Sequence, residues 1–394
     1  MKALFFHVPT LGIYHSIEPV LLELQARGNE VIHYNDVSFR QYLQNTTIPF
    51  TPYSHYQGYF PSRCSSTMSV FEYGLLLLET AEHMMDVVEA VVIRESPDLI
   101  LHSRFMAAPK VIASRAGIPA VCLTDFVFDP RTVLAEKSKT RSGVELSNIA
   151  STLKFRKRAK KFYEKHVHGC YDIDDIFINN EPLTLVLGLE VFQPSRVALS
   201  CNCKCVGPTI WIAGYSKQYE LIYASLGSVF VDNKGFYETC IRALGSFTMP
   251  VIISLSGRFY PEEFENVPSN VELHRFVRQT DVLQKSAVFI THGGHNSVAE
   301  AIYCATPMVV VPQIPEQLIR AQQVQRMGLG KYLNPNELSI PLLRSFVAEV
   351  LANPIFRNNV QALKDTLPKT PAASTACDEI EVFMSEHNAC ANRN

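Results

Sequence analysis

Residues 287–300 read Ala-Val-Phe-Ile-Thr291-His292-Gly293-Gly294-His295-Asn296-Ser297-Val-Ala-Glu300, and this stretch decides the fold. The apolar run 287–291 predicts a buried parallel strand, and the spacing of apolar residues over 296–304 predicts a helix. The segment His292-Gly-Gly between them is therefore a tight strand-to-helix turn. Such turns are typical of parallel α/β sheets.

This turn is well suited to binding a phosphate group. Gly293 and Gly294 carry no Cβ, so an anion can approach the backbone closely. We expect Asn296 or Ser297 to cap the helix, whose N-terminus offers about half a positive charge. His292, at the carboxyl end of the strand, can donate a hydrogen bond to a phosphate oxygen.

Two further features distinguish the segment from a plain turn. Glu300 lies one turn along the helix, where its carboxylate can accept two hydroxyl hydrogen bonds from a ribose. After the next expected strand the chain reads Pro312-Gln313-Ile-Pro-Glu316-Gln317. A lone Gly-Gly pair indicates only a turn, whereas the complete set predicts a site for a nucleotide-sugar diphosphate.

The combination of His292-Gly-Gly-x-Asn-Ser-x-x-Glu300 with Pro312-Gln313-x-x-Glu316-Gln317 resembles the donor signature of the family-one glycosyltransferases, the UDP-glycosyltransferases. The bacterial macrolide and antibiotic branch is the most similar. The likeness extends through residues 222–230, 276–279 and 206–208 and the opening Phe5-Phe-His-Val-Pro. It implies the GT-B architecture, an α/β chain with two facing doubly wound, Rossmann-like parallel sheets.

The resemblance also implies an activity. Members of the family invert the anomeric centre as they transfer a sugar from a UDP-sugar, and we expect UDP-glucose as the donor. The expected acceptor is a small lipophilic molecule such as a natural product, as in antibiotic biosynthesis. No metal or other cofactor is expected, because the helix N-terminus and nearby donors stabilise the departing diphosphate.

Donor-site roles carry over residue by residue. The resemblance assigns phosphate contacts to Ser228, His292, Asn296 and Ser297, the ribose to Glu300, the nucleobase to Val277 and Gln279, and the sugar hydroxyls to Glu316 and Gln317. Arg278 replaces the family's usual proline. His295 takes a position often held by Trp or Met, where it offers a polar contact to sugar or phosphate.

The first half departs from the family at its catalytic dyad. The family has a base histidine after a glycine, steadied by an aspartate at the end of a later strand. Aligned without a gap on Gly12 and Arg27-Gly28, this chain has Ile13 at the histidine position and Ser103 at the aspartate position. An aliphatic side chain cannot accept a proton.

Three residues are candidates for the missing base. His15 lies two places after Ile13 and titrates near neutrality; it is equally well read as a helix-entry residue bonded to local backbone. Asp125 ends the expected strand 119–124, and His102 is a distant third because strand alternation turns it away from Ser103. The alternative function is a catalytically inactive homologue that binds nucleotide sugar or supports a partner enzyme.

Strands and helices alternate in both halves, which predicts two parallel sheets. The expected domains are 1–205 for the acceptor, a linker at 206–221, 222–372 for the nucleotide sugar, and a final helix at 373–394 that in the resembled family crosses back. Strands are expected at 3–8, 30–34, 97–103, 119–124, 222–226, 250–255, 271–274, 287–291 and 307–311. Helices are expected at 17–27, 70–94, 354–366 and 376–388.

Composition excludes several classes of protein. The 394 residues include 36 basic and 38 acidic side chains, so no strong field points to nucleic acid. No apolar stretch is long enough to cross a membrane, and no secretory signal is evident, so we expect a cytoplasmic monomer or homodimer without stable membrane insertion. The ten cysteines show no disulfide pattern.

Two local patterns have plain interpretations. Cys201-Asn-Cys203-Lys-Cys205 is a poor match to zinc-ligand spacing, so we expect reduced cysteines on a strand. The basic run Lys154–Lys161 spreads its charges over several helical faces, which favours a solvated helix over a membrane-binding one.

Overall fold

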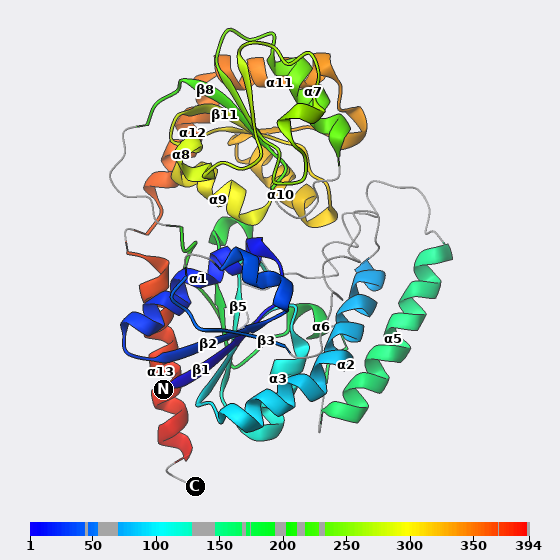
Figure 1. The fold of residues 1–394 in the computed structure, drawn as a ribbon, viewed down its shortest axis with the longest axis vertical. Coiled ribbons are helices and arrows are strands. Elements are labelled where there is room, and N and C mark those ends of the chain that lie inside the picture. The colour runs from blue at the N-terminus through cyan, green and yellow to red at the C-terminus, as the bar shows by residue number, and fades with distance from the viewer. Residues whose placement is uncertain are drawn as a thin grey trace. The chain divides into compact units, whose positions relative to one another are not determined.

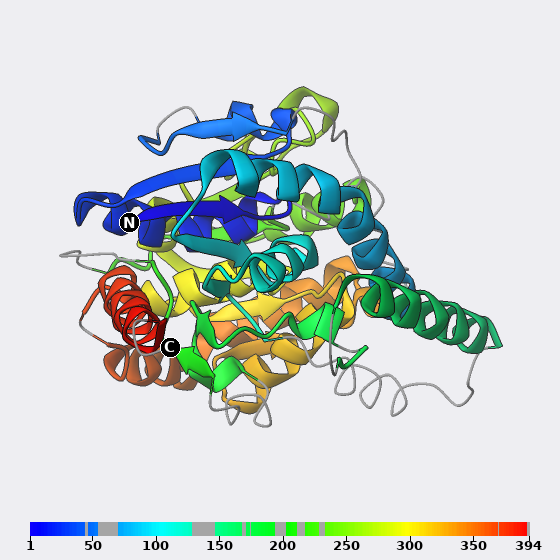
Figure 2. The same cartoon turned by 90° about the horizontal axis from the view of Figure 1, so that it is seen from below.

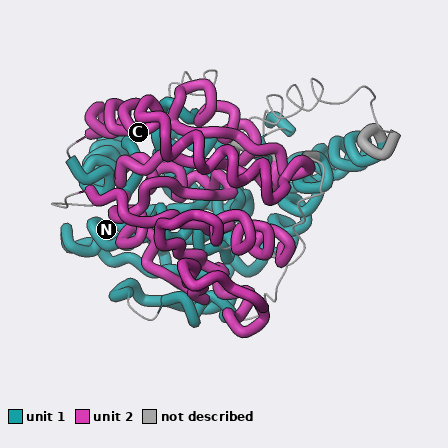
Figure 3. Tube along the Cα trace, turned by 90° about the horizontal axis from the view of Figure 1, so that it is seen from above, with its two compact units in different colours: residues 1–209, 370–394 teal, residues 210–369 magenta. Residues whose placement is uncertain are grey.

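The computed structural model describes residues 1–43, 46–53, 70–127, 146–167, 171–173, 175–193, 202–210, 217–227, 233–368 and 370–391. The chain divides into two compact units (Figure 3). Unit 1 consists of Met1–Thr209 and Thr370–Asn394, and unit 2 consists of Ile210–Lys369. The first division falls inside the segment expected as a linker, and the second lies a few residues before the expected final helix.

The sheet of unit 1 is parallel throughout its described strands, whose order is β3-β2-β1-β4-β5-β6-β7 (Figure 1). The strands are β1 (Lys2–Phe6), β2 (Glu30–Asn35), β3 (Phe50–Pro52), β4 (Leu99–Ser103), β5 (Ala120–Thr124), β6 (Leu183–Val186) and β7 (Cys203–Cys205). Phe6 pairs with Tyr34 of β2 and with His102 of β4. The order reverses between β1 and β4, and ligands of such sheets bind beside that reversal, outside the carboxyl ends of the strands.

Helices cover the sheet of unit 1. They are α1 (Leu11–Ala26), α2 (Val70–Glu95), α3 (Ala107–Ala116), α5 (Leu146–His166), the single turn α6 (Asp175–Ile178) and α13 (Ala372–Ala391), with 3-10 turns at Val37–Tyr42 and Glu190–Phe192. Figures 1 and 2 both show α5 beside α2, where Arg158 Nη2 lies 2.6 Å from Glu82 Oε2. Lys154, Lys157 and Lys161 are exposed on α5, so the basic run is helical with exposed lysines, and its lack of membrane binding stays a prediction.

Helix α1 begins earlier than the sequence predicted. The expected start at residue 17 is wrong: the helix begins at Leu11, and Thr10 before it is extended. Pro19 lies inside the helix and has no N–H, so it cannot bond the His15 carbonyl one turn earlier. Ile13 and His15 are therefore both helical residues, and at about 100° per residue they point to different faces.

The last helix, α13, packs against α1 inside unit 1. Cys377 and Ile380 are fully buried in the core that α1 shares with the sheet. Arg27 Nη1 lies 2.6 Å from Asp378 Oδ1 and 3.2 Å from Glu381 Oε2. The helix begins four residues before its expected start, directly after Pro371. The C-terminal segment thus completes the hydrophobic core of unit 1.

Unit 2 has a second parallel sheet with the described strand order β10-β9-β8-β11-β12-β13. The strands are β8 (Leu221–Ser225), β9 (Val251–Ser254), β10 (Val271–His274), β11 (Ser286–Thr291), β12 (Met308–Val310) and β13 (Gly330–Tyr332). The helices are α7 (Lys234–Leu244), α8 (Gln279–Leu283), α9 (His295–Tyr303), α10 (Pro315–Arg326), α11 (Ile340–Ala352) and α12 (Pro354–Asp365), with 3-10 turns at Pro261–Glu263 and Pro335–Glu337. Here the order reverses between β8 and β11.

The cysteine cluster is structural within the described residues. Cys203 and Cys205 are free thiols on β7, and they donate to Asn180 Oδ1 and the Gly188 carbonyl. Cys201 lies outside the described residues. The described residues contain no group of three or more His, Cys, Asp or Glu that would hold a metal ion. No helix in the same ranges is long and apolar enough to cross a bilayer.

We predict that Gly330→Ala destabilises unit 2. A Cβ at Gly330 would lie 1.9 Å from the carbonyl oxygen of Met308 on β12. A backbone contact cannot be relieved by a rotamer change, so we expect a loss of about 1–3 kcal/mol. The matched control is Gly235→Ala in α7, whose Cβ would meet only Asn233 Oδ1 at 3.8 Å, and it should gain up to about 1 kcal/mol. Urea denaturation measures both, and equal midpoints would contradict the close packing of β12 and β13.

Candidate functional site

The turn between β11 and α9 holds the His292 ring in a gap between two glycines. A Cβ at Gly227, which follows β8, would lie 2.4 Å from His292 Cε1. A Cβ at Gly294 would lie 2.3 Å from His292 Nε2. The sheet order reverses between β8 and β11 (Figure 1). His292 directly follows β11 and therefore lies at the switch point of unit 2.

His292 is a neutral polar group at this point. Burial, together with the smaller effect of the Arg320 charge, lowers the pKa of its imidazole to about 3. The buried Nδ1 has no hydrogen-bond partner among the described residues. A neutral imidazole carries one N–H donor and one acceptor, so the ring can offer a hydrogen bond to a ligand without adding charge.

The N-terminus of α9 has no side-chain cap among the described residues. The prediction that Asn296 or Ser297 caps this helix is wrong, because Gly294 is the N-cap and the two residues are the second and third of the helix. Gly293 before it has φ +81°, the left-handed region that favours glycine. The first N–H groups of a helix lack intrahelical partners, so an anion can take the place of a capping side chain.

Glu300 belongs to a hydrogen-bonded chain that crosses unit 2. Gln279 Nε2 donates to Glu300 Oε2 at 2.6 Å and to Ser297 Oγ at 3.2 Å. Tyr223 on β8 donates its hydroxyl to Gln279 Oε1 at 3.2 Å. Burial raises the pKa of Glu300 to about 7, although the hydrogen bond from Gln279 opposes the shift. The chain places three predicted donor residues, Gln279, Ser297 and Glu300, in direct contact.

An aromatic residue lies beside the segment expected to contact the nucleobase. The Phe276 side chain is 61% exposed, and a Cβ at Gly257 would lie 2.2 Å from its Cζ. Val277 follows it and is half-buried. Phe276 was given no role from the sequence, although its place directly before Val277 was the available signal. The exposed ring can stack on a base.

The loop from β12 into α10 holds Glu316 and Gln317. Gln317 is buried, and its Oε1 accepts the Gln313 backbone N–H at 2.7 Å. Glu316 lies in the first turn of α10, and its Oε1 is 3.2 Å from Arg320 Nη2. Arg320 also donates through Nη1 to the Gly293 carbonyl at 2.6 Å. Arg320 was not predicted as a site residue; its signal in the sequence was a basic residue one helical turn after Glu316.

Two further predicted donor residues are Ser228 and His295. Ser228 lies outside the described residues. His295 is the first residue of α9 and is buried. Its expected contact to sugar or phosphate stays a prediction.

In unit 1 the two base candidates lie on separate elements. His15 is an exposed residue of α1, and surrounding protein atoms lower the pKa of its imidazole, with Glu18 opposing the shift. Ile13 is half-buried and packs against the apolar core. Asp125 directly follows β5, is half-buried, and accepts a hydrogen bond from Gln193 Nε2 at its backbone oxygen.

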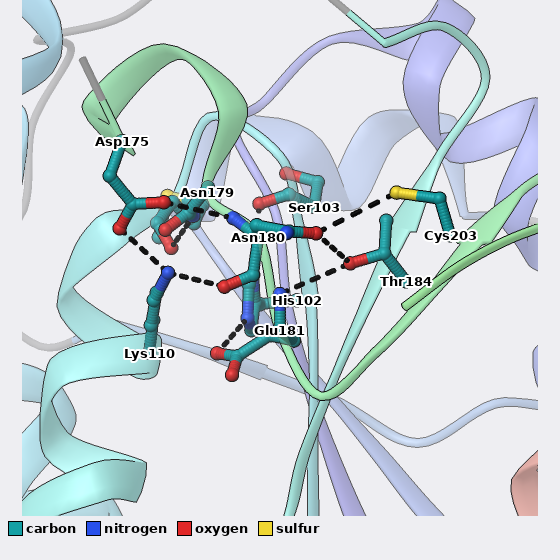
Figure 4. A network of polar contacts seen from close by, with 10 residues as sticks. His102, Ser103, Lys110, Asp175, Asn179, Asn180, Glu181, Thr184 and Cys203 are labelled. Carbon is teal, nitrogen blue, oxygen red and sulfur yellow. Dashed lines mark hydrogen bonds and ion pairs between the residues drawn. The ribbon is translucent and has the colours of Figure 1, made fainter. Parts of the chain in front are cut away.

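The carboxyl end of β4 has no carboxylate where the family has its aspartate. Ser103 ends the strand and is buried, and its Oγ has no hydrogen-bond partner among the described residues. His102 beside it is fully buried, with Nε2 2.9 Å from Glu181 Oε1 and Nδ1 3.2 Å from the Ser103 carbonyl (Figure 4). Because both ring nitrogens face oxygens, His102 is held inside the fold and is a poor candidate for the base.

A family model matches the second half of the chain. The family described as "Erythromycin biosynthesis protein CIII-like, C-terminal domain" matches residues 238–382. This range includes every predicted donor residue except Ser228, which precedes it.

Named relatives match far more of the chain. NDP-glycosyltransferase YjiC of Bacillus licheniformis is 26% identical over 96% of this chain and 97% of its own length. Oleandomycin glycosyltransferase of Streptomyces antibioticus is 26% identical over 73% of this chain and 68% of its own length. The crystal structure of the glycotransferase of kitacinnamycin has a TM-score of 0.80 at 24% identity, covering 96% of this chain and 98% of that one.

We predict that Glu300→Gln stabilises the protein in a pH-dependent way. The folded pKa of about 7 exceeds the ordinary value of 4.5, so the native state holds this proton more tightly. The resulting stabilisation is complete below pH 4.5 and is lost as pH rises through 7. Glutamine cannot ionise, so at pH 8 the variant should be more stable than the wild type by about 3 kcal/mol.

Urea denaturation at pH 5 and pH 8 checks this prediction. The matched control is Glu238→Gln, which alters an exposed carboxylate on α7. It should leave the pH dependence unchanged. A Glu300→Gln variant with the same stability difference at both pH values would contradict the raised pKa.

Proposed function

We propose that the chain is a family-one glycosyltransferase with the GT-B fold, and that it transfers a sugar from a UDP-sugar, with UDP-glucose as the expected donor, to a small lipophilic acceptor. The observation that carries the proposal is the His292 ring between Gly227 and Gly294, beside an uncapped helix N-terminus at the switch point of unit 2. Natural products are the expected acceptors, in keeping with the names of several relatives.

Each donor group has a matching feature in unit 2. The diphosphate takes the N-terminus of α9 and a hydrogen bond from His292. Glu300 accepts the ribose hydroxyls, and Glu316 and Gln317 hold the sugar. The nucleobase stacks on Phe276 and meets the main chain of Val277 and Gln279. The proposal assigns stabilisation of the leaving diphosphate to the helix N-terminus and not to a metal ion.

The proposed reaction is a single displacement with inversion. An oxygen of the acceptor forms a bond to C1 of the sugar, while the bond from C1 to the diphosphate oxygen breaks. The acceptor's proton passes to a base, and the nucleoside diphosphate leaves with the bonding electron pair. The donor side stabilises the negative charge that develops on the leaving group.

The base is proposed in unit 1. His15 and Asp125 are the candidates, because each follows the carboxyl end of a strand of the parallel sheet, where ligands of such sheets bind. His15 is exposed, and its lowered pKa keeps the imidazole neutral and able to accept a proton at pH 7.

One observation favours a second function. Ile13 and Ser103 replace both members of the family's dyad, and neither side chain can take a proton from an acceptor at neutral pH. A binding protein for nucleotide sugars would need the donor residues of unit 2 and no base in unit 1. Donor turnover without acceptor separates the two functions, because only an enzyme hydrolyses the donor that it binds.

We predict that UDP binds at the α9 turn. By calorimetry UDP or dTDP should bind at least about tenfold more tightly than ADP. Gly294→Val should abolish this binding, since its Cβ would displace His292, and Glu300→Ala should weaken it by roughly 1–3 kcal/mol through lost ribose hydrogen bonds. Gly235→Ala is the control and should bind like the wild type. Unchanged UDP affinity in both site variants would reject the donor assignment.

We predict that one base candidate controls the rate of transfer. If His15 is the base, His15→Ala should lower kcat by roughly 10²–10⁴ and leave UDP affinity nearly unchanged. If Asp125 is the base, the same loss should appear in Asp125→Asn. The double variant Ile13→His with Ser103→Asp should increase transfer to simple phenols. Failure of the wild type and of this variant to consume any donor that they bind would favour the binding protein.

A further inference from the structure

We propose that Arg320 is a positioning residue that links the diphosphate turn to the sugar-binding carboxylate of Glu316. Through this link, recognition of the sugar would depend on the position of the turn that holds the phosphates. The inference rests on the proposed function, because that function assigns a nucleotide-sugar donor to the α9 turn. It concerns contacts within unit 2 alone.

The Arg320 guanidinium is almost completely buried, which is unusual for an arginine side chain. Its side chain is 2% exposed, although it lies on α10 among residues that include exposed Arg326. Removing a guanidinium from water costs several kcal/mol unless charge and hydrogen bonds compensate. Both compensating contacts that we describe are made to parts of the candidate donor site.

The first contact fixes the peptide plane of the turn. Arg320 Nη1 donates to the Gly293 carbonyl oxygen at 2.6 Å. In a planar trans peptide the carbonyl and the following N–H point in opposite directions, so this bond also directs the Gly294 N–H away from Arg320. Gly293 needs an external anchor, because its φ of +81° is one of several that glycine adopts freely.

The second contact holds the carboxylate of Glu316. Arg320 Nη2 lies 3.2 Å from Glu316 Oε1, one helical turn earlier on α10. A carboxylate has two oxygens, so Glu316 can bond Arg320 through Oε1 and accept a sugar hydroxyl through Oε2. The planar guanidinium serves both partners at once, whereas a lysine ammonium on its flexible stem is a single point charge.

The packing around the turn supports the same link. A Cβ at Gly293 would lie 3.6 Å from the backbone oxygen of Gln317, so the start of α10 is close to the turn. Arg320 Nη1 bonds the carbonyl of Gly293, the residue after His292, and the charge of Arg320 lowers the pKa of the His292 imidazole. A cation beside the turn favours a diphosphate as its ligand.

Calorimetry with two ligands tests the link. Kd values for UDP and for UDP-glucose are measured for the wild type, Arg320→Gln and Arg320→Lys, with Arg326→Gln as a matched control on the exposed end of α10. Arg320→Gln should weaken UDP-glucose binding about tenfold more than UDP binding. Arg320→Lys should recover part of that difference. The control should stay within about twofold of the wild type for both ligands.

A double-mutant cycle completes the experiment. Glu316→Gln should cause the same sugar-specific loss, and combining it with Arg320→Gln should add little further loss, because both variants break one link. If Arg320→Gln does not fold, the losses in UDP and UDP-glucose affinity are compared in Glu316→Gln and Arg320→Lys instead. Equal losses for UDP and UDP-glucose, or additive losses in the cycle, would overturn the inference alone. A folded wild type that binds no nucleoside diphosphate would overturn the proposed function and the inference with it.

Discussion

The candidate site of unit 2 depends on one steric constraint, the gap that Gly227 and Gly294 leave for the His292 ring. A Cβ on either side would collide with the imidazole. The ring of His292 after β11 therefore requires glycine both at 227, after β8, and at 294. Gly294 has no side chain, and the N-terminus of α9 therefore has no side-chain cap from its N-cap residue. Glycine at 294 thus has two consequences: the neutral His292 ring can pack closely, and helix α9 begins without a capping side chain at its N-cap.

Hydrogen bonds extend this arrangement across unit 2. Tyr223, Gln279 and Glu300 form a continuous chain from β8 through α8 to α9. The chain keeps a carboxylate in place before any ligand binds, and burial makes that carboxylate unusually easy to protonate. Preorganisation of this kind reduces the ordering that a ligand would otherwise require. The raised pKa of Glu300 also makes hydrogen bonding at the site depend on pH, because protonation gives the carboxylate a donor in place of an acceptor.

The sequence was informative where the determining contacts are local. The turn from Thr291 to Glu300 is contiguous, so its strand, glycines and helix could be predicted together. The cap was mispredicted, because backbone geometry at Gly294 and not the preference for Asn or Ser decides it. Arg320 was missed because its bond to Gly293 spans 27 residues. In unit 1 the predicted start of α1 at residue 17 was wrong. The helix begins at Leu11 and tolerates Pro19 in its interior, because packing stabilises it.

The route of the chain through α13 makes unit 2 an insertion within unit 1. The chain leaves unit 1 near Thr209 and returns near Thr370 to supply Cys377 and Ile380 to a core built mainly by the first 200 residues. A truncation at residue 369 would therefore destabilise unit 1 and not unit 2. Recombination between relatives faces the same topology: exchanging unit 2 needs two crossovers, and a single crossover would join an α1 and an α13 that never evolved together.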